Sequence, residues 1–272
     1  MSDRISVKIE GGVADVRLIR SDKMNALDDA MFEAMVTTGE KLAADKSLRC
    51  VVLSGEGRAF CAGLDMGNFG KMAEGGGASG ATGGRSKLAD RTHGIANRAQ
   101  QACWAWRNLP VPVIASIHGV ALGGGFQVAL GSDIRIVHPD TKMSIMEIKW
   151  GLVPDMGATP IMMRLAREDV VRQLTYTGRI FSGREALDYG FATQVSETPH
   201  EDAMKMAHLI ASKNPDAMRA NKQMMNNLGD MTDAEALLQE SVLQDAIIGT
   251  PNQIEAIMSE LQKRPAKFAN PV

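Results

Sequence analysis

Three consecutive glycines at positions 123–125 stand between two apolar segments, and they are the residues of this sequence best suited to chemistry. Residues 113–117 have the character of a buried strand, and Phe126 begins a segment with the character of a helix. The glycines should therefore open that helix with free N–H groups. Because such groups at the positive end of a helix stabilise negative charge, the run indicates a site for an oxyanion or an anionic ligand.

A second loop of similar character lies at residues 58–65, after the apolar segment 49–54, and its small residues also let the backbone face a ligand. Two such loops can supply two N–H donors. An acyl thioester carbonyl that becomes an enolate needs two donors aimed at one oxygen, and the loss of one costs about 3 kcal/mol in the transition state. A triple glycine by itself more often reflects tight packing, so the second loop strengthens the chemical interpretation.

The elements that must position these loops alternate between strand and helix through the first two thirds of the chain. A hairpin is predicted from residues 5–10 and 13–19, and buried strands are predicted at 49–54, 113–117 and 133–137. This alternation is typical of an α/β core. After Pro154 helical patterns dominate. Helices are predicted over residues 29–42 with Asp28 as the cap, 86–108, 126–130, 159–166, 169–175, 183–189, 201–212, 216–227, 233–246 and 251–262.

These patterns divide the chain into a core, residues 1–200, and a C-terminal helical region, residues 201–272. Residues 67–84 are rich in glycine and predict a flexible loop. Because that loop lies beside the site at 58–65, we expect it to act as a mobile lid.

Composition excludes several classes of function. Thirty basic and thirty-two acidic residues give a formal net charge of −2, which does not favour nucleic-acid binding. Cys50, Cys61 and Cys103 fit neither a disulfide framework nor a CxxC pair, which indicates a reducing compartment. No apolar run approaches the roughly 18 residues of a membrane span, and the patterned segment 5–9 leaves no room for a leader. We expect a cytoplasmic protein that binds neither nucleic acid nor membrane.

Metal and nucleotide motifs are also missing from the sequence. The five histidines lack metal-ligand spacing and no HExxH occurs, so no metal is predicted. The glycine run does not extend to GxGxxG because position 128 is valine, and no GxxxxGK[ST] occurs, so neither NAD nor ATP is implied. Cys61 has no candidate base linked to it and is interpreted as a packing residue, and His118 as a structural hydrogen-bonding residue.

Over nearly its whole length the chain resembles the crotonase superfamily, the enoyl-CoA hydratase/isomerase family. The resemblance rests on Lys23-Met24-Asn25-Ala26-Leu27, Phe60-Cys61-Ala62-Gly63-Leu64-Asp65, His118-Gly119-Val120-Ala121-Leu122-Gly123-Gly124-Gly125, residues 147–157, and Phe181-Ser182-Gly183-Arg184-Glu185-Ala186 with Gly190. Each motif alone is weak, whereas their order and spacing together are specific. The resemblance implies a spiral of repeated ββα units, completed by C-terminal helices that assemble a homotrimer or a hexamer built as a dimer of trimers.

The resemblance also implies an acyl-CoA substrate, with no cofactor beyond the coenzyme A thioester itself. It assigns the two oxyanion N–H groups to Ala62 and Gly124. In the family's tail a basic and an aromatic residue meet coenzyme A across a subunit boundary, and a solvated helix end is the alternative for residues 263–268. The positions implied to contact substrate are Met24, Ala26, Ala62, Gly63, Leu64, Asp65, Gly123, Gln127 and Phe268.

Acid/base chemistry is implied at three further positions. In hydratases of the family two glutamates activate and protonate a water, and they fall here on Gln127 and Glu147. An amide cannot exchange a proton near neutral pH. Asp155, however, lies eight residues beyond Glu147, as in dienoyl-CoA isomerases, where this pair removes and returns a proton. Because two carboxylates in a dry pocket disfavour double ionisation, one can serve as acid and the other as base.

Isomerisation of a 3,5-dienoyl thioester to a 2,4-dienoyl thioester by Glu147 and Asp155 is therefore the preferred mechanism. The isomerase branch carries an aspartate where Gln127 stands, so the match is incomplete. Hydration by Glu147 with Gln127 orienting the water is the first alternative, and an inactive acyl-CoA-binding protein is the second. Asp155 also resembles the nucleophile of aromatic acyl-CoA dehalogenases, which pair it with an aromatic pocket.

Overall fold

The computed structural model describes residues 3–73 and 87–271, and within them six strands form the main sheet in the order β1-β2-β3-β4-β6-β9. The first pair is antiparallel and each later pair is parallel. The predicted hairpin and the three predicted buried strands are all confirmed. The strands are β1 (Ile5–Glu10), β2 (Val13–Leu18), β3 (Cys50–Gly55), β4 (Val113–Ile117), β6 (Ile134–Val137) and β9 (Gln194–Val195).

A smaller sheet of the described residues contains β5 (Val120–Leu122), β7 (Lys142–Ser144) and β8 (Phe181–Ser182), in the order β5-β7-β8. The sequence analysis did not predict these strands, because two or three residues are too few to establish a period. In the chain β4, β5 and the helix α5 (Gly124–Leu130) follow one another, which is a strand–strand–helix unit of the spiral that the resemblance implies.

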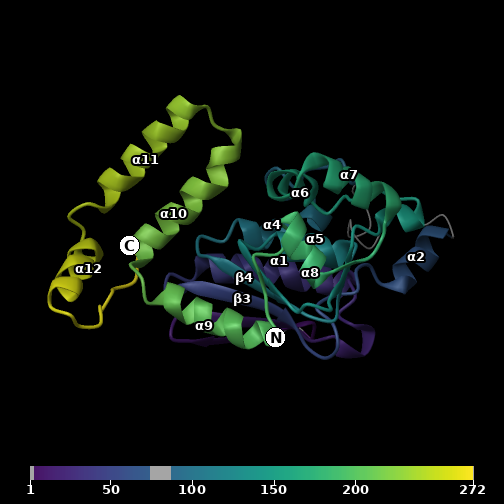
Figure 1. Cartoon of the computed structure of the whole chain (residues 1–272), viewed down its shortest axis with the longest axis horizontal. Helices are drawn as coiled ribbons and strands as arrows, with labels where there is room; N and C mark the ends of the chain where they lie inside the picture. The colour runs from purple at the N-terminus through teal and green to yellow at the C-terminus, as the bar shows by residue number, and fades with distance from the viewer. Residues whose placement is uncertain (1–2, 74–86, 272) are drawn as a thin grey trace.

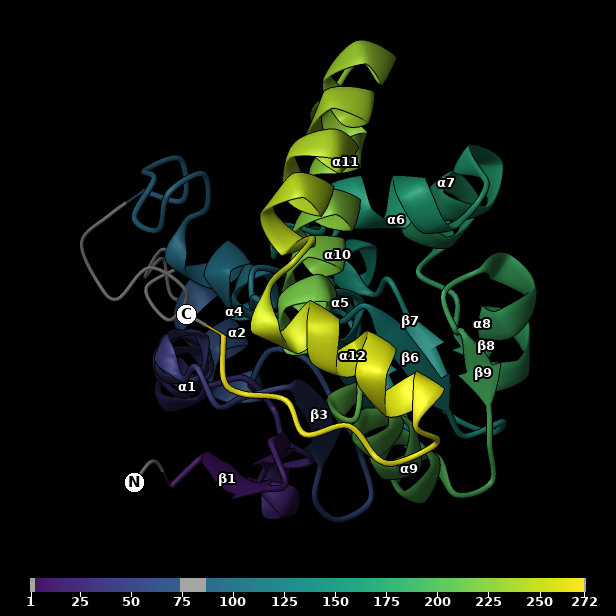
Figure 2. The same ribbon diagram turned by 90° about the vertical axis from the view of Figure 1, so that its left-hand side faces the viewer.

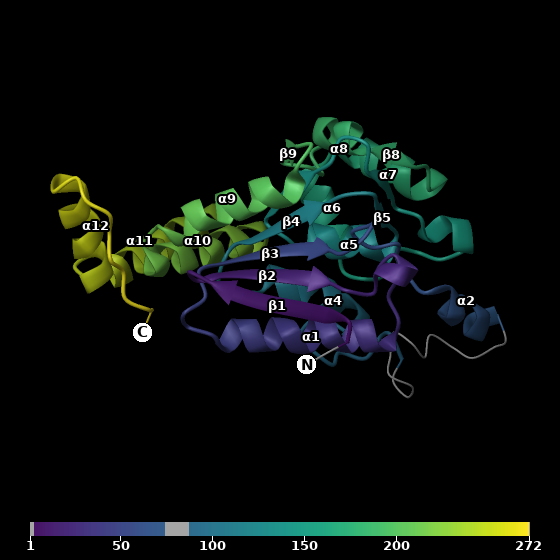
Figure 3. The same cartoon turned by 90° about the horizontal axis from the view of Figure 1, so that it is seen from below.

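Helices cover both faces of the main sheet, so β3 is apolar along nearly its whole length. Val51 and Leu53 face a core that also receives side chains of α1, α4 and α5, whereas Cys50 and Val52 face the side on which α9 packs. Figure 3 shows α1 and α9 on opposite sides of the sheet. The remaining elements are α1 (Asp29–Ala44), α2 (Met66–Ala73), α4 (Arg98–Arg107), α6 (Thr159–Leu165), α7 (Glu168–Thr177), α8 (Gly183–Tyr189), α9 (Pro199–Ala211), α10 (Pro215–Asn227), α11 (Asp233–Ile247), α12 (Pro251–Leu261), η1 (Ser21–Lys23), η2 (Glu147–Trp150) and η3 (Leu228–Asp230).

Two sequence predictions near the site are corrected. The stretch 67–84 was predicted as a flexible loop, but its first part belongs to helix α2, and residues 74–84 lie outside the described residues. A helix was predicted over 86–108, but α4 begins only at Arg98. The reason is local: the Asn97 side chain accepts from the Gln100 N–H, the Gln100 side chain accepts from the Asn97 N–H, and this capping box starts the helix there.

The C-terminal helices leave the body of the protein after α9. Helices α10, α11 and α12 extend away from the main sheet (Figures 1 and 2). The tail then returns to the core, where Arg49 Nη2 donates to the Ala269 carbonyl over 3.1 Å and to Asn270 Oδ1 over 2.9 Å. Within the described part of the chain, no helix combines the length and the apolar character that crossing a membrane requires.

A charged contact holds the start of α9 on the sheet. Asp15 of β2 lies 3.1 Å from His200 Nε2 and accepts from Arg17 Nη2 over 2.6 Å. Burial by itself raises the pKa of Asp15, but the hydrogen bonds from His200 and Arg17 outweigh it and lower the pKa to about 2.

We predict that Asp15→Asn lowers the free energy of unfolding by about 2 kcal/mol at pH 7. The folded-state pKa lies below the unfolded-state value, so this contribution is complete above about pH 5 and is lost as the pH falls toward 2. Urea unfolding at pH 7 and pH 3 should show the difference falling to roughly half at pH 3. The exposed Asp140→Asn is the control, and a pH-independent difference for Asp15→Asn contradicts the prediction.

Candidate active site

The two loops that the sequence analysis singled out lie against each other. Cys61 and Ala121 form a parallel bridge, and the Leu122 N–H donates to the Cys61 carbonyl over 3.1 Å. Gly63 has φ +89°, and a Cβ built there would lie 2.5 Å from the Leu122 carbonyl oxygen and 3.6 Å from the Gly124 nitrogen. Only glycine permits this approach, so the loop after β3 borders the start of α5 directly.

The glycine run opens α5 as predicted. Gly123 is the N-cap residue, with φ 50° and ψ −119°, and Gly124 is the first residue of the helix. The N–H of Gly124 therefore has no preceding turn to supply its acceptor. Gly125 packs against the other loop, since a Cβ there would lie 2.3 Å from the Cys61 carbonyl oxygen.

The N–H of Ala62, the donor implied by the resemblance, already has an acceptor within the protein. It donates to the carbonyl of Met24 over 2.9 Å. Met24 and Asn25 both have positive φ, 49° and 56°, and this local backbone turn accompanies the contact. The neighbouring Ala26 carbonyl accepts from Arg20 Nη1 over 3.1 Å. Met24 thus adjoins the loop through its backbone carbonyl, and Ala26 shares the Arg20 guanidinium with Asp65 of the loop.

The N–H of Leu64 is in a different situation. Leu64 and Leu27 form a parallel bridge in which the Leu27 N–H donates to Gly63 and the Asp65 N–H donates to Leu27. Because this ladder uses the groups on either side of Leu64, its own N–H points away from Leu27. Among residues 3–73 and 87–271 that N–H has no hydrogen-bond acceptor. In this loop Leu64, and not Ala62, offers an uncommitted N–H beside the start of α5.

Glu147 begins η2 and is 9% exposed, and its carboxylate adjoins the glycine run. A Cβ built on Gly123 would lie 3.5 Å from Glu147 Oε1. That oxygen accepts from Gln127 Nε2 over 2.7 Å, whereas Oε2 is buried and has no partner among the described residues. Burial raises the pKa of Glu147, the nearby charge of Asp155 adds to the rise, and the hydrogen bond from Gln127 acts in the opposite direction.

Gln127 is 1% exposed, and both ends of its amide are engaged. Its Oε1 accepts from the N–H groups of Met156 and Ala158, over 3.0 and 3.4 Å, and its Nε2 donates to Glu147. The two backbone donors determine the orientation of the amide, because a flipped amide would set N–H against N–H and oxygen against carboxylate. Gln127 is therefore a fixed donor to Glu147.

Asp155 lies in the segment between η2 and α6 and directly precedes the residues that Gln127 holds. Its side chain is exposed, yet the surrounding protein displaces enough water to raise the pKa of its carboxyl group. The charge of Asp155 thus acts on Glu147, and of these two residues Glu147 is buried whereas Asp155 is accessible to solvent.

Asp65 and Phe268 lie elsewhere than the glycine run. Asp65 Oδ2 accepts from Arg20 Nη1 over 2.6 Å, an ion pair at the end of the loop. Phe268 lines a cavity with Gly12 and Ser47, beside the turn that leads into β2. Because β2 and β3 are parallel, this turn is at the opposite edge of the sheet from the loop after β3. The structure does not bring Phe268 into the site of its own chain.

Comparison with known proteins agrees with this fold. The sequence model of the enoyl-CoA hydratase/isomerase family matches residues 8–271, and the chain belongs to that family. Similar chains include a mitochondrial Δ(3,5)-Δ(2,4)-dienoyl-CoA isomerase of Dictyostelium discoideum, 26% identical over 94% of this chain and 87% of that protein, and a mitochondrial methylglutaconyl-CoA hydratase of Mus musculus, 28% identical over 94% and 79%. The crystal structure of a putative enoyl-CoA hydratase from Streptomyces coelicolor superposes with a TM-score of 0.84 at 28% identity, covering 99% of this chain and 95% of that one.

We predict that the three glycines differ in their tolerance of a side chain. Gly125→Ala should cost about 3 kcal/mol of unfolding free energy or prevent folding, because its Cβ meets the backbone of Cys61. Gly124→Ala should cost about 1 kcal/mol, because its Cβ meets only the flexible ends of Met156 and Leu27, at 2.6 and 2.9 Å. Urea unfolding of both variants tests this, and equal losses contradict it.

Proposed function

We propose that this protein is an acyl-CoA double-bond isomerase that works through a thioester enolate, with Glu147 and Asp155 as its proton-transfer groups. One observation carries the proposal: the Gln127 amide is fully engaged by two backbone donors and by Glu147, which leaves Glu147 Oε2 and the Asp155 carboxylate as the candidate acid/base groups beside this amide. Relatives named dienoyl-CoA isomerase and methylglutaconyl-CoA hydratase support acyl-CoA chemistry of this class.

In this reaction a 3,5-dienoyl thioester becomes a 2,4-dienoyl thioester without net gain or loss of a proton. The ionised Glu147 takes a proton from C2, and the electron pair moves into the conjugated thioester enolate. Asp155 then donates a proton to C6, which leaves double bonds at C2 and C4, and the proton on Glu147 returns to Asp155 through solvent after the product leaves. Glu147 is assigned to C2 because its carboxylate adjoins Gly123, beside the place proposed for the carbonyl.

The N–H groups of Gly124 and Leu64 are proposed to hold the enolate oxygen. They replace the pair Ala62 and Gly124, since the Ala62 N–H is committed to Met24. Two preorganised N–H donors stabilise the charge that develops on the oxygen, and each is worth about 3 kcal/mol in the transition state. No cofactor beyond the coenzyme A thioester is needed for this chemistry.

Hydration remains the second candidate, because one of the similar chains is named a hydratase. The buried Gln127 does not favour it: both ends of the amide are engaged, so this side chain is poorly placed to orient a water. In that case Glu147 alone activates the water. We also propose a cytoplasmic location, which agrees with the three buried free cysteines.

We predict that Glu147→Gln and Asp155→Asn separate these functions. With a 3,5-dienoyl-CoA, each variant should lose at least about 100-fold in kcat. Asp155→Asn should keep solvent deuterium exchange at C2, because Glu147 still removes that proton, whereas Glu147→Gln should lose it. Rapid hydration of crotonyl-CoA that survives Asp155→Asn would favour the hydratase. Tight acyl-CoA binding by wild type with neither turnover nor exchange would identify a binding protein.

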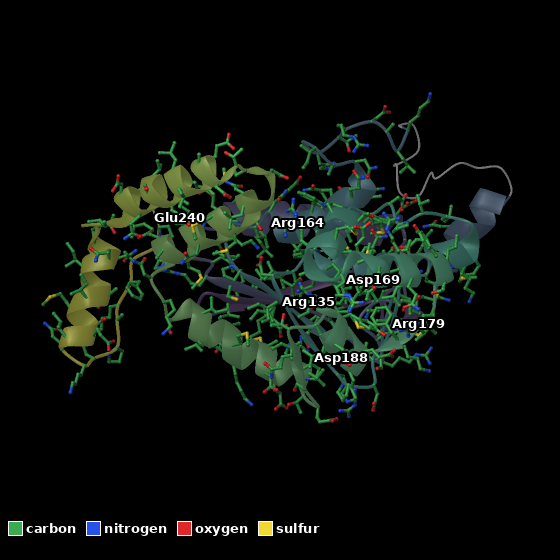
Figure 4. The ribbon with its side chains drawn as sticks, turned by 45° about the horizontal axis from the view of Figure 1, so that its top comes forward. Arg135, Arg164, Asp169, Arg179, Asp188 and Glu240 are labelled. Atoms are coloured by element: carbon green, nitrogen blue, oxygen red, sulfur yellow. The ribbon has the colours of Figure 1, made fainter. Side chains whose placement is uncertain are left out.

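We further propose that the C-terminal helices assemble the chain into a homotrimer or a hexamer. On α11 the side chains of Leu237, Leu238 and Val242 are all more than half exposed. Helices α10, α11 and α12 line a groove whose wall includes Leu243, and Figure 4 shows Glu240 on α11, away from the body of the protein. An apolar face on a projecting element is typical of a contact between copies.

We predict that wild-type protein is trimeric or hexameric by light scattering after gel filtration, and that Leu238→Asp shifts it to smaller species. A charge buried in an apolar interface costs several kcal/mol unless it is paired. Gln173→Asp, an exposed position on α7, adds the same charge and should leave the mass unchanged. A monomeric wild type would refute the assembly.

A further inference from the structure

The three residues after Asp155 are held by two side chains from different parts of the fold. The N–H groups of Met156 and Ala158 donate to Gln127 of α5, and the carbonyl of Gly157 accepts from Trp104 Nε1 of α4 over 2.9 Å. We propose that Trp104 is a positioning residue for the reaction, which acts by fixing the segment that carries the Asp155 carboxylate. This role rests on the proposed function, in which Asp155 returns the proton.

The contact between Trp104 and Gly157 is close and specific. Gly157 has φ +86°, and a Cβ there would lie 2.6 Å from both Cδ1 and Nε1 of the indole. The ring therefore lies against the Gly157 backbone while its N–H donates to the same residue. The Arg107 guanidinium lies over the ring, 5.9 Å from its centroid, and adds a cation–π contact. Partly buried against the core, the indole is a firm support for a short segment.

The segment needs such support at Asp155, because its side chains pack in the core only beyond that residue, where Met156 and Ala158 are buried. Leu152, Val153 and Asp155 are exposed, and the backbone between η2 and α6 belongs to neither a helix nor a strand. Gln127 holds it through two N–H groups and Trp104 through one carbonyl. Proton transfer requires its groups within about 0.5 Å of the productive geometry, and a misplacement of about 1 Å can cost 100-fold in rate. Loss of the hydrogen bonds made by either Gln127 or Trp104 should therefore displace the Asp155 carboxylate.

The same helix offers a matched control. Trp106 lies two residues further along α4, is fully buried, and has an indole N–H without a partner among the described residues. Trp104→Phe and Trp106→Phe remove the same atoms from the same helix. Only the first removes a hydrogen bond to the segment that follows Asp155. A general loss of packing in α4 should therefore affect both variants, whereas a positioning role should affect one.

The test compares Trp104→Phe, Trp106→Phe, Asp155→Asn and the double variant Trp104→Phe/Asp155→Asn with a 3,5-dienoyl-CoA as substrate. Trp104→Phe should lower kcat about tenfold with KM changed less than twofold, because binding is intact and only proton return is misplaced. Trp106→Phe should stay within about twofold of wild type in kcat. Deuterium exchange at C2 should persist in Trp104→Phe, because Glu147 is held by Gln127.

The double variant supplies the decisive readout. If Trp104 acts through Asp155, adding Trp104→Phe to Asp155→Asn should lower kcat no further. The positioning role would be overturned if the two losses in kcat multiplied in the double variant, or if Trp104→Phe and Trp106→Phe lowered kcat equally. Either result would leave the proposed function standing. If Asp155→Asn isomerised the substrate at the wild-type rate, the proposed function would be overturned, and the role of Trp104 with it.

Discussion

The architecture of the site depends on the close approach of two backbones. Gly63 and Gly125 leave no room for a Cβ, because the carbonyls of Leu122 and Cys61 would meet it at 2.5 and 2.3 Å. Glycine at both positions lets the loop after β3 lie against the start of α5, so two N–H groups from distant parts of the sequence lie near one another. Under the proposed function, elements that support the sheet and α5 therefore also determine where a thioester oxygen is held.

Burial raises the pKa of Glu147, and the buried Gln127 amide opposes this rise. A carboxylate at Gln127 would have to be protonated to donate to Glu147, whereas the amide donates at every pH and still accepts from Met156 and Ala158. Gln127 thus offsets part of the desolvation that raises the pKa of Glu147. The amide cannot transfer a proton at this position, but its hydrogen bonds fix the geometry of Glu147.

Local signals made much of this predictable from the sequence. The Asp28 cap, the glycine opening of α5 and the apolar run of β3 each depend on neighbouring residues, and each was found where expected. The commitment of the Ala62 N–H depends on a contact with Met24 that is 38 residues away in sequence, and the place of Phe268 depends on how the tail returns to the β1–β2 turn. Periodicity carries no information about such contacts, and β5 and β7 are too short to show a period.

In the proposed function, the two carboxylates differ in burial and therefore in task. Glu147 is nearly inaccessible, and its free oxygen has no partner among the described residues, which leaves that oxygen available to a substrate bound beside it. Asp155 is open to solvent and can exchange its proton with water between turnovers. A buried base beside the enolate and an accessible acid further along the chain suit a proton shift between distant carbons better than the addition of water to neighbouring ones. Because Asp155 itself is exposed, the proposed reaction depends on the anchored backbone behind it to fix the position of its carboxylate.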